Sequence, residues 1–139
     1  MKHLFVDTAT LLYATGGNHP LRQPCRALLV SAAAGAVGLH ISTEAVQEYL
    51  FHRMRRVDRT AAVAQAIEVM GLCKLHPFDE AVVRRMIDVV ATSEIRGRDA
   101  VHVATAQVAG FAAIVSPDTD LDRAPGLRRL SPREALTTA

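Results

Sequence analysis

Apolar residues follow two patterns along this chain. Short continuous runs are typical of buried strands and predict strands over residues 3–6, 37–41, 73–75, 112–115 and 127–130. Longer segments with apolar residues three or four positions apart predict helices over 8–14, 21–34, 43–55, 58–70, 79–92 and 98–109, with a last one opening at Ser131-Pro132. Strands that alternate with helices indicate an α/β fold, here a three-layer α/β/α sandwich with a mostly parallel sheet of four to five strands.

The segment 79–92 shows the helical pattern most clearly. Its apolar side is expected to face the core, and this side comprises Val82, Val83, Met86, Ile87 and Val90. Ser42 or Thr43 and Asp58 stand where helix N-caps are favoured, just before two of the other helical segments.

The composition indicates a globular chain, which we treat as a single domain over residues 1–139. Half of the residues are apolar, enough for a real core, but only 4% are aromatic and Trp is absent. No apolar run approaches the roughly 20 residues of a membrane helix, and the start of the chain lacks the features of a signal peptide. Cys25 and Cys73 show no metal-binding spacing. We therefore expect a cytoplasmic protein with free thiols and no membrane partner.

The net charge of +2 conceals an uneven choice of basic residues. Of the 16 basic residues, Lys2 and Lys74 are the only lysines and the rest are Arg. The planar guanidinium suits phosphate recognition. A bias in codon usage explains the same composition equally well, so the charge alone does not establish a nucleic-acid partner.

Four acids are expected at one edge of the predicted sheet. Asp7 directly follows the first strand, and Asp118 follows the fourth. Glu48 lies about one turn into the helix after the second strand, and Asp99 opens the helix after Gly97. Such a group of carboxylates needs a counter-charge, which Mg²⁺ or Mn²⁺ would provide. A cation held there can bind phosphate oxygens and activate water for attack on a phosphodiester.

Each of these acids alone also fits a structural role. Asp7 is a possible helix cap, Asp99 complements a helix dipole, and Asp118 lies in a turn sequence, while Glu48 is a possible solvated helix residue. The presence of all four acids at one edge of the sheet favours a metal site over four separate structural roles. Asp120 is a further candidate ligand, and Glu44, one turn before Glu48, is a candidate for an outer position.

Basic and histidine side chains near these acids allow two interpretations. Arg53, Arg56 and Arg98 are candidates for contacts with an RNA backbone, or else belong to solvated charged faces. His52 and His102 follow Glu48 and Asp99 by one turn, and for both we favour a surface or boundary role over a metal-binding role.

The ordered set of motifs resembles a known family. The matching segments are Leu4-Phe5-Val6-Asp7-Thr8, Ile41-Ser42-Thr43 leading to Glu48, residues 97–106 around Asp99, and residues 114–121 around Asp118. In this order and over nearly the whole chain they resemble PIN-domain nucleases, specifically the VapC-type toxins of toxin–antitoxin pairs.

The resemblance implies an endoribonuclease that depends on Mg²⁺ or Mn²⁺, with Asp7, Glu48, Asp99 and Asp118 as catalytic and metal-binding residues and Asp120 as a further ligand. It also implies an RNA substrate, a homodimer held by helices, and a cognate antitoxin protein that occludes the site.

This chain departs from the family pattern at two positions. Ala9 stands where the family usually has Asn or Ser, and Asp120 is followed by Leu121 where Phe is frequent. Two other phosphate-handling enzymes are disfavoured: a haloacid-dehalogenase-like site needs a second Asp at position 9, and a receiver domain needs a further acidic pair and a downstream Lys. The remaining alternative is a degenerate PIN domain that binds RNA or a protein without cleavage.

Overall fold

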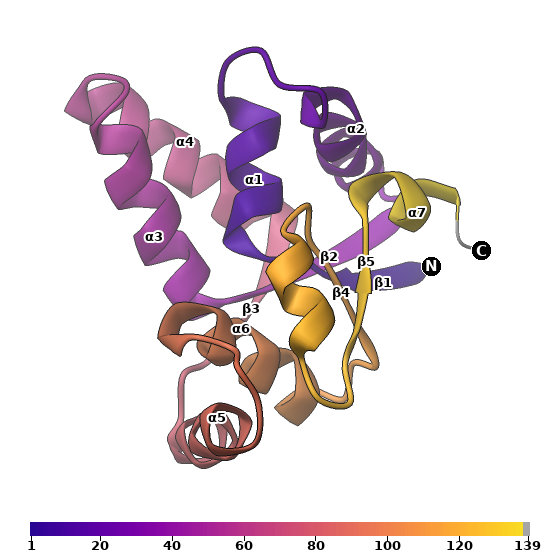
Figure 1. The fold of residues 1–139 in the computed structure, drawn as a ribbon. Coiled ribbons are helices and arrows are strands. Elements are labelled where there is room, and N and C mark those ends of the chain that lie inside the picture. Colours follow the sequence, from indigo (N-terminus) through magenta and orange to yellow (C-terminus); the bar gives the residue numbers. More distant parts are fainter. Residues whose placement is uncertain (138–139) are drawn as a thin grey trace.

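The strands form a parallel sheet in the order β3-β2-β1-β4-β5 in this computed structural model, which describes residues 1–137 (Figure 1). The strands are β1 (Lys2–Phe5), β2 (Val37–Ser42), β3 (Cys73–His76), β4 (Ala113–Val115) and β5 (Arg128–Leu130). β1 pairs with β2, β2 with β3 and β4 with β5. A single bridge between Val6 and Val115 joins the two groups of strands.

Helices cover both faces of this sheet, so the predicted three-layer α/β/α sandwich is confirmed (Figure 1). One face carries α1 (Thr8–Thr15), α2 (Arg22–Ala33), α3 (Thr43–Met54), α4 (Arg59–Leu72) and α7 (Pro132–Thr137). The other face carries α5 (Glu80–Thr92) and α6 (Gly97–Val108), and the short 3₁₀ helix η1 (Thr119–Arg123) follows β4. No helix within residues 1–137 is long and apolar enough to cross a membrane.

Side-chain alternation along the strands divides the core in two. On β1 and the residue after it, Leu4 and Val6 pack into the core beneath α1 to α4, whereas Phe5 packs into the core beneath α6. Both cores consist mainly of aliphatic residues, as the composition predicts. Cys25 and Cys73 are free thiols, and burial raises the pKa of each to about 12.

Helix α5 buries a narrower stripe than its sequence predicts. Val82 and Val89 are buried, but Ile87 and Val90 are exposed, so their predicted inward orientation is wrong. The physical reason is that α5 is an outer helix that packs mainly against α6 (Figure 1). A helix with one neighbour buries one stripe, however wide its apolar side is.

Three histidines form a row across the sheet. Nδ1 of His3 on β1 lies 2.9 Å from Nε2 of His40 on β2, and Nδ1 of His40 lies 2.8 Å from Nε2 of His76 on β3. The ring of Phe111 packs against His40 with the ring centres 4.9 Å apart. These imidazoles face the α6 side of the sheet, outside the acidic site described next.

Candidate active site

Asp7 lies at the junction of the two strand groups, buried at the carboxyl end of β1. Its backbone N–H donates to the carbonyl of Val115 on the neighbouring strand, with N and O 3.1 Å apart. Its Oδ1 accepts the backbone N–H and the hydroxyl of Thr10, both at 3.1 Å, and the hydroxyl of Ser116 donates to Oδ2 at 2.5 Å. Asp7 is therefore also the N-cap of α1, and its structural and candidate catalytic roles coexist.

Burial dominates the ionisation of Asp7. It raises the pKa of this carboxyl from 3.8 to about 6, against the opposing effects of the hydrogen bonds from Ser116 and Thr10 and of the charge of His102. The loss of solvation therefore outweighs the hydrogen bonds and the charge that favour the ionised form of Asp7.

Asp118 is tied to Asp7 through Ser116. The backbone N–H of Asp118 donates to the Ser116 hydroxyl oxygen at 3.0 Å, and the same hydroxyl donates to Asp7. Asp118 Oδ1 in turn accepts the backbone N–H of Asp120 at 2.9 Å and caps η1. Asp120 itself is exposed at the rim.

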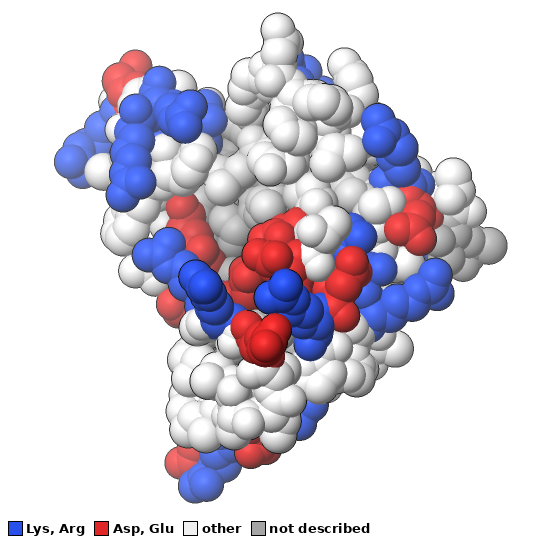
Figure 2. Space-filling model, viewed as in Figure 1, with Lys and Arg blue, Asp and Glu red and all other residues white. Residues whose placement is uncertain are grey.

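Asp99 lies in the first turn of α6, half-buried beside the other acids. Its pKa is raised first by burial and then by the negative charge of Asp118, with Glu48 and Asp120 adding to the effect and His102 opposing it. Asp118, Glu48 and Asp120 are thus close enough to Asp99 to act on it, and Figure 2 shows acidic side chains gathered at the centre of this face.

Glu48 is held by a buried network that includes His102. Its Oε1 lies 2.5 Å from Nε2 of His102 and accepts the Thr8 hydroxyl at 3.3 Å. Nδ1 of His102 lies 2.8 Å from the hydroxyl of Ser42, the N-cap of α3. The same hydroxyl oxygen accepts the Ala45 N–H, so Ser42 joins the start of α3 to the His102 ring, whose Nε2 faces Glu48.

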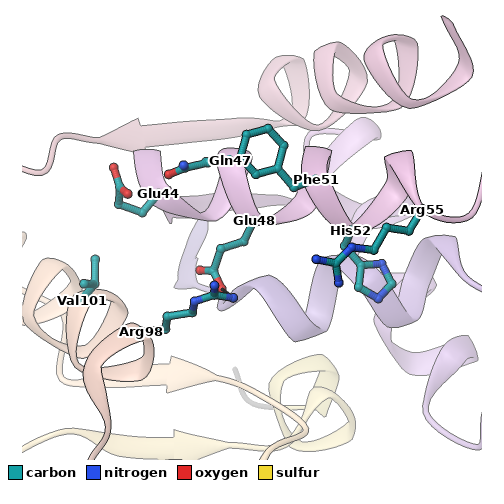
Figure 3. A pocket seen from close by; sticks show the side chains of 8 residues that line it. All are labelled: Glu44, Gln47, Glu48, Phe51, His52, Arg55, Arg98 and Val101. Carbon is teal, nitrogen blue, oxygen red and sulfur yellow. Dashed lines mark ion pairs between the residues drawn. The ribbon is translucent and has the colours of Figure 1, made fainter. Parts of the chain in front are cut away.

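These contacts keep Glu48 ionised. Burial acts to raise its pKa, but the hydrogen bond and charge of His102, the Thr8 hydroxyl and the charge of Arg98 together hold the pKa below its ordinary value. Nη1 of Arg98 lies 4.0 Å from the other oxygen, Oε2, and the two side chains point toward one another from α6 and α3 (Figure 3).

The three arginines that the sequence nominates for RNA contacts lie in different surroundings. Arg98 and Arg56 are exposed. Arg53 is buried, and its Nε donates to Oε1 of Gln65 at 2.9 Å, joining α3 to α4. Its guanidinium faces a helix contact rather than solvent, so we correct the expectation that Arg53 contacts RNA. Arg55, two residues later, lines a surface pocket instead.

Several site residues were missed or underrated at the sequence level. His102 is buried, so its interpretation as a surface or boundary residue is wrong. Ser116 and Thr10 supply polar contacts to Asp7 where Ala9 offers none. The one sequence signal for these residues is their position next to an acid, in Asp7-Thr8-Ala9-Thr10 and Ser116-Pro117-Asp118. Glu44 lines the same pocket as Glu48, one turn away.

The donor set of this site fits a hard divalent cation in chemical type. All the clustered acids offer carboxylate oxygens, and a cation beside Asp99 would offset the negative charges of Asp118, Glu48 and Asp120 that help to raise the pKa of Asp99. Within residues 1–137, however, no three Asp, Glu, His or Cys side chains converge closely enough to hold a metal ion. Both oxygens of Asp7 and one of Glu48 accept hydrogen bonds from neighbours, and each of these oxygens keeps a second lone pair that a cation can use.

Comparisons with known proteins agree with one another. The family model described as PIN domain matches residues 4–127. Ribonuclease VapC7 of Mycobacterium tuberculosis (strain ATCC 25618 / H37Rv) is 36% identical over 118 residues, which cover 83% of this chain and 81% of that relative. Ribonuclease VapC13 of the same strain is 28% identical over 131 residues, 92% of this chain and 99% of the relative.

Solved structures support the fold. VapBC2 from Rickettsia felis, bound to a DNA fragment from the promoter, matches with a TM-score of 0.74 at 13% identity and covers 93% of this chain and 98% of the other. Mycobacterium tuberculosis VapC20, described as a sarcin-ricin loop cleaving toxin, matches with a TM-score of 0.69 at 18% identity over 86% of this chain and 92% of the other.

Proposed function

Because the chain belongs to the PIN-domain family and its curated relatives are named VapC ribonucleases, we propose that it is an endoribonuclease that depends on Mg²⁺ or Mn²⁺ and acts as the toxin of a toxin–antitoxin pair. The observation that carries this proposal is the mutual proximity of Asp99, Asp118 and Glu48 at the edge where Asp7 is buried. No nucleophilic Ser or Cys is needed if water is the attacking group.

Each acid has a part in this proposal. Asp7, Asp99, Asp118 and Glu48 would hold the cation, with Asp120 as a further ligand. When bound, a divalent cation stabilises charge on phosphate oxygens and lowers the pKa of a coordinated water molecule. Ser116 and Thr10 fix the orientation of Asp7, and His102 fixes that of Glu48. Arg98 and Arg56 are exposed and can meet the phosphates of an RNA strand.

The proposed partners follow from the relatives. Several similar folds are known from toxin–antitoxin complexes, among them VapBC proteins from Rickettsia felis and Salmonella typhimurium. We accordingly propose a cognate antitoxin that occludes the acidic site, and a homodimer held by helices. The RNA substrate is proposed on the names of the curated relatives.

The test is cleavage of single-stranded RNA by the purified protein. Wild type should cleave with Mg²⁺ or Mn²⁺ and stop when the metal is chelated. Asp7→Asn should abolish cleavage, because it removes the negative charge at the centre of the site. The matched control is Asp88→Asn, which alters an exposed acid on α5 and should leave cleavage intact. A wild type that binds RNA without cutting it would indicate a degenerate PIN domain, and undiminished cleavage by Asp7→Asn would reject the assignment.

A further inference from the structure

A pocket of about 320 Å³ lies between α3 and the first turns of α6, next to the acidic site (Figure 3). One wall is a stripe along α3 that includes Gln47, Glu48, Phe51 and Arg55, and the other wall is Arg98 and Val101 of α6. Since Glu48 belongs both to this wall and to the acidic site, any occupant of the pocket lies beside the reacting centre.

Phe51 is unusual among the aromatic residues of this chain. Its exposed fraction is 53%, whereas every other Phe or Tyr within residues 1–137 is buried or half-buried. Packing does not account for a phenyl ring left on the surface beside charged groups. An exposed aromatic face at such a place is suited to stacking with an unpaired base, which every nucleotide offers regardless of its sequence.

Two guanidinium groups line the same pocket as this ring. Arg55 follows Phe51 by one helical turn, and Arg98 projects from the opposite wall with its side chain 86% exposed. Nη1 of Arg98 lies 4.0 Å from Oε2 of Glu48, and because the Arg98 side chain is largely exposed its other N–H groups remain accessible to phosphate oxygens. Arginine forks can bind phosphate oxygens in a bidentate manner, so the pocket combines one aromatic stacking surface with two groups that can bind phosphate.

A second pocket lies on the other side of Asp99 and is lined by Arg96, Asp120 and Arg123 among others. It contains no aromatic residue. The acidic side chains therefore lie between a pocket with an aromatic ring and a pocket with only charged and aliphatic walls. A single strand of nucleic acid that runs from the first pocket to the second would cross the acidic side chains. Figure 2 shows basic side chains at the border of these acids.

We propose that the pocket between α3 and α6 binds one unpaired nucleotide of a single-stranded RNA, next to the phosphate that is cut, with the base stacked on Phe51 and the adjoining phosphates on Arg55 and Arg98. This subsite rests on the proposed ribonuclease function and defines where its substrate lies. A second copy of the chain fits the pocket less well, because the centres of interfaces between subunits are depleted of charge, whereas two arginines and two glutamates line this one.

The chain contains no Trp, so Phe51→Trp creates a single fluorescent reporter at the proposed stacking position. In an Asp7→Asn background, which leaves the RNA uncut, titration with eight-nucleotide oligouridylate or oligoadenylate should quench this fluorescence to saturation. Phe51→Ala in the same background should raise the Kd for both oligonucleotides about tenfold or more, the effect of losing one base–aromatic stack. Arg55→Ala should weaken binding and lower the slope of log Kd against log salt by about 0.7.

The matched control is Ile67→Ala, which truncates a side chain 63% exposed on α4. It should leave the Kd unchanged, and both truncations should leave the thermal midpoint unchanged because neither side chain is buried. If wild type cleaves RNA but Phe51→Ala binds normally and Phe51→Trp is not quenched, the subsite is wrong and the ribonuclease function stands. If instead Phe51→Ala alters sedimentation and not RNA affinity, the pocket is an interface between copies, and the proposal is overturned.

Discussion

Nε2 of His102 lies 2.5 Å from Oε1 of Glu48, although the two residues are 54 positions apart in the chain. The contact links α6 to α3 across the carboxyl end of the sheet. Through Ser42, the same ring is linked to the beginning of α3, the helix that carries Glu48. His102 therefore fixes both the acid and the helix that presents it.

Substitution of His102 should separate these two links. His102→Gln places an amide near the position of Nε2 and keeps a donor to Glu48, whereas His102→Asn keeps a partner for Ser42 and releases Glu48. We expect His102→Asn to lower kcat and the affinity for Mn²⁺ by about 10- to 100-fold, as for other outer contacts of metal ligands, and His102→Gln to retain most of both. Titration calorimetry with Mn²⁺ and RNA cleavage rates measure these effects. Equal losses in the two variants would indicate that His102 only fills space.

Asp7 should make the metal-free protein less stable as the pH rises. Its pKa is 3.8 when unperturbed and about 6 in the fold, so between these values the folded state holds a proton that the unfolded state has lost. The free energy of unfolding therefore falls from about pH 4 to pH 6 by at most about 3 kcal/mol through this group. Urea denaturation of wild type and Asp7→Asn across this range measures the difference in their free energies of unfolding. As the pH rises from 4 to 6, the variant should become increasingly more stable than wild type.

Divalent cation should reverse that destabilisation. At pH 7 in chelator, Asp7→Asn is expected to be more stable than wild type, and saturating Mn²⁺ should raise the unfolding midpoint of wild type more than that of the variant. A wild type whose midpoint does not respond to Mn²⁺ would contradict the proposed cation site.

Arg53 and Arg56 should behave differently despite their similar surroundings in the sequence. Arg53→Ala removes the hydrogen bond to Gln65 and leaves Oε1 of Gln65 without this donor. We therefore expect the free energy of unfolding to fall by about 1–3 kcal/mol. Arg56→Ala alters an exposed residue and should leave stability within about 0.5 kcal/mol while weakening RNA binding in a salt-dependent manner. Chemical denaturation and RNA titration of both variants test this pair. An unchanged Arg53→Ala stability would show that the helix contact is not needed.

The histidine row should make the fold sensitive to acid. The pKa of His40 is lowered by burial first and then by His76, His3 and Lys74, and the pKa of His76 is lowered by burial and Lys74. Since the folded state favours neutral rings, this contribution to stability is present above about pH 6.5 and is lost as the pH falls through the lower folded values. His40→Gln should therefore show a smaller loss of stability between pH 7.5 and 5.5 than wild type in urea denaturation. An identical loss of stability in wild type and His40→Gln over this pH range would contradict the predicted role of the histidine row.

The layer architecture and the positions of the acids could be predicted from sequence because they depend on local patterns. Asp7 and Asp118 follow apolar runs that can only be strands, and parallel strands bring their carboxyl ends to one edge. Ser42 and Asp58 cap helices as their positions indicate. In these cases a residue and its immediate neighbours determine the outcome.

The parts that could not be predicted depend on which element packs against which. Ile87 belongs to the predicted apolar side of 79–92 and Val89 does not, yet Val89 is buried and Ile87 is exposed. Nothing near Arg53 identifies Gln65 as its partner, and the partner of His102 lies on another helix. Sequence periodicity gives the width of an apolar side but not the number of neighbours that cover it.

The bridge between Val6 and Val115 has a consequence for the synthesis of this protein. The hydrogen bond from the Ser116 hydroxyl to Asp7, which connects Asp7 to Asp118, joins two residues that are 109 positions apart in the chain. A ribosome that has completed β1, β2 and β3 has made neither Asp99 nor Asp118, and β1 then has a partner on one side only. The growing polypeptide thus lacks the complete acid cluster until β4 and η1 have emerged and joined β1. If the proposed activity is correct, the messenger and ribosome that produce the chain are safe from it until residues 113–123 have been made and have joined the sheet.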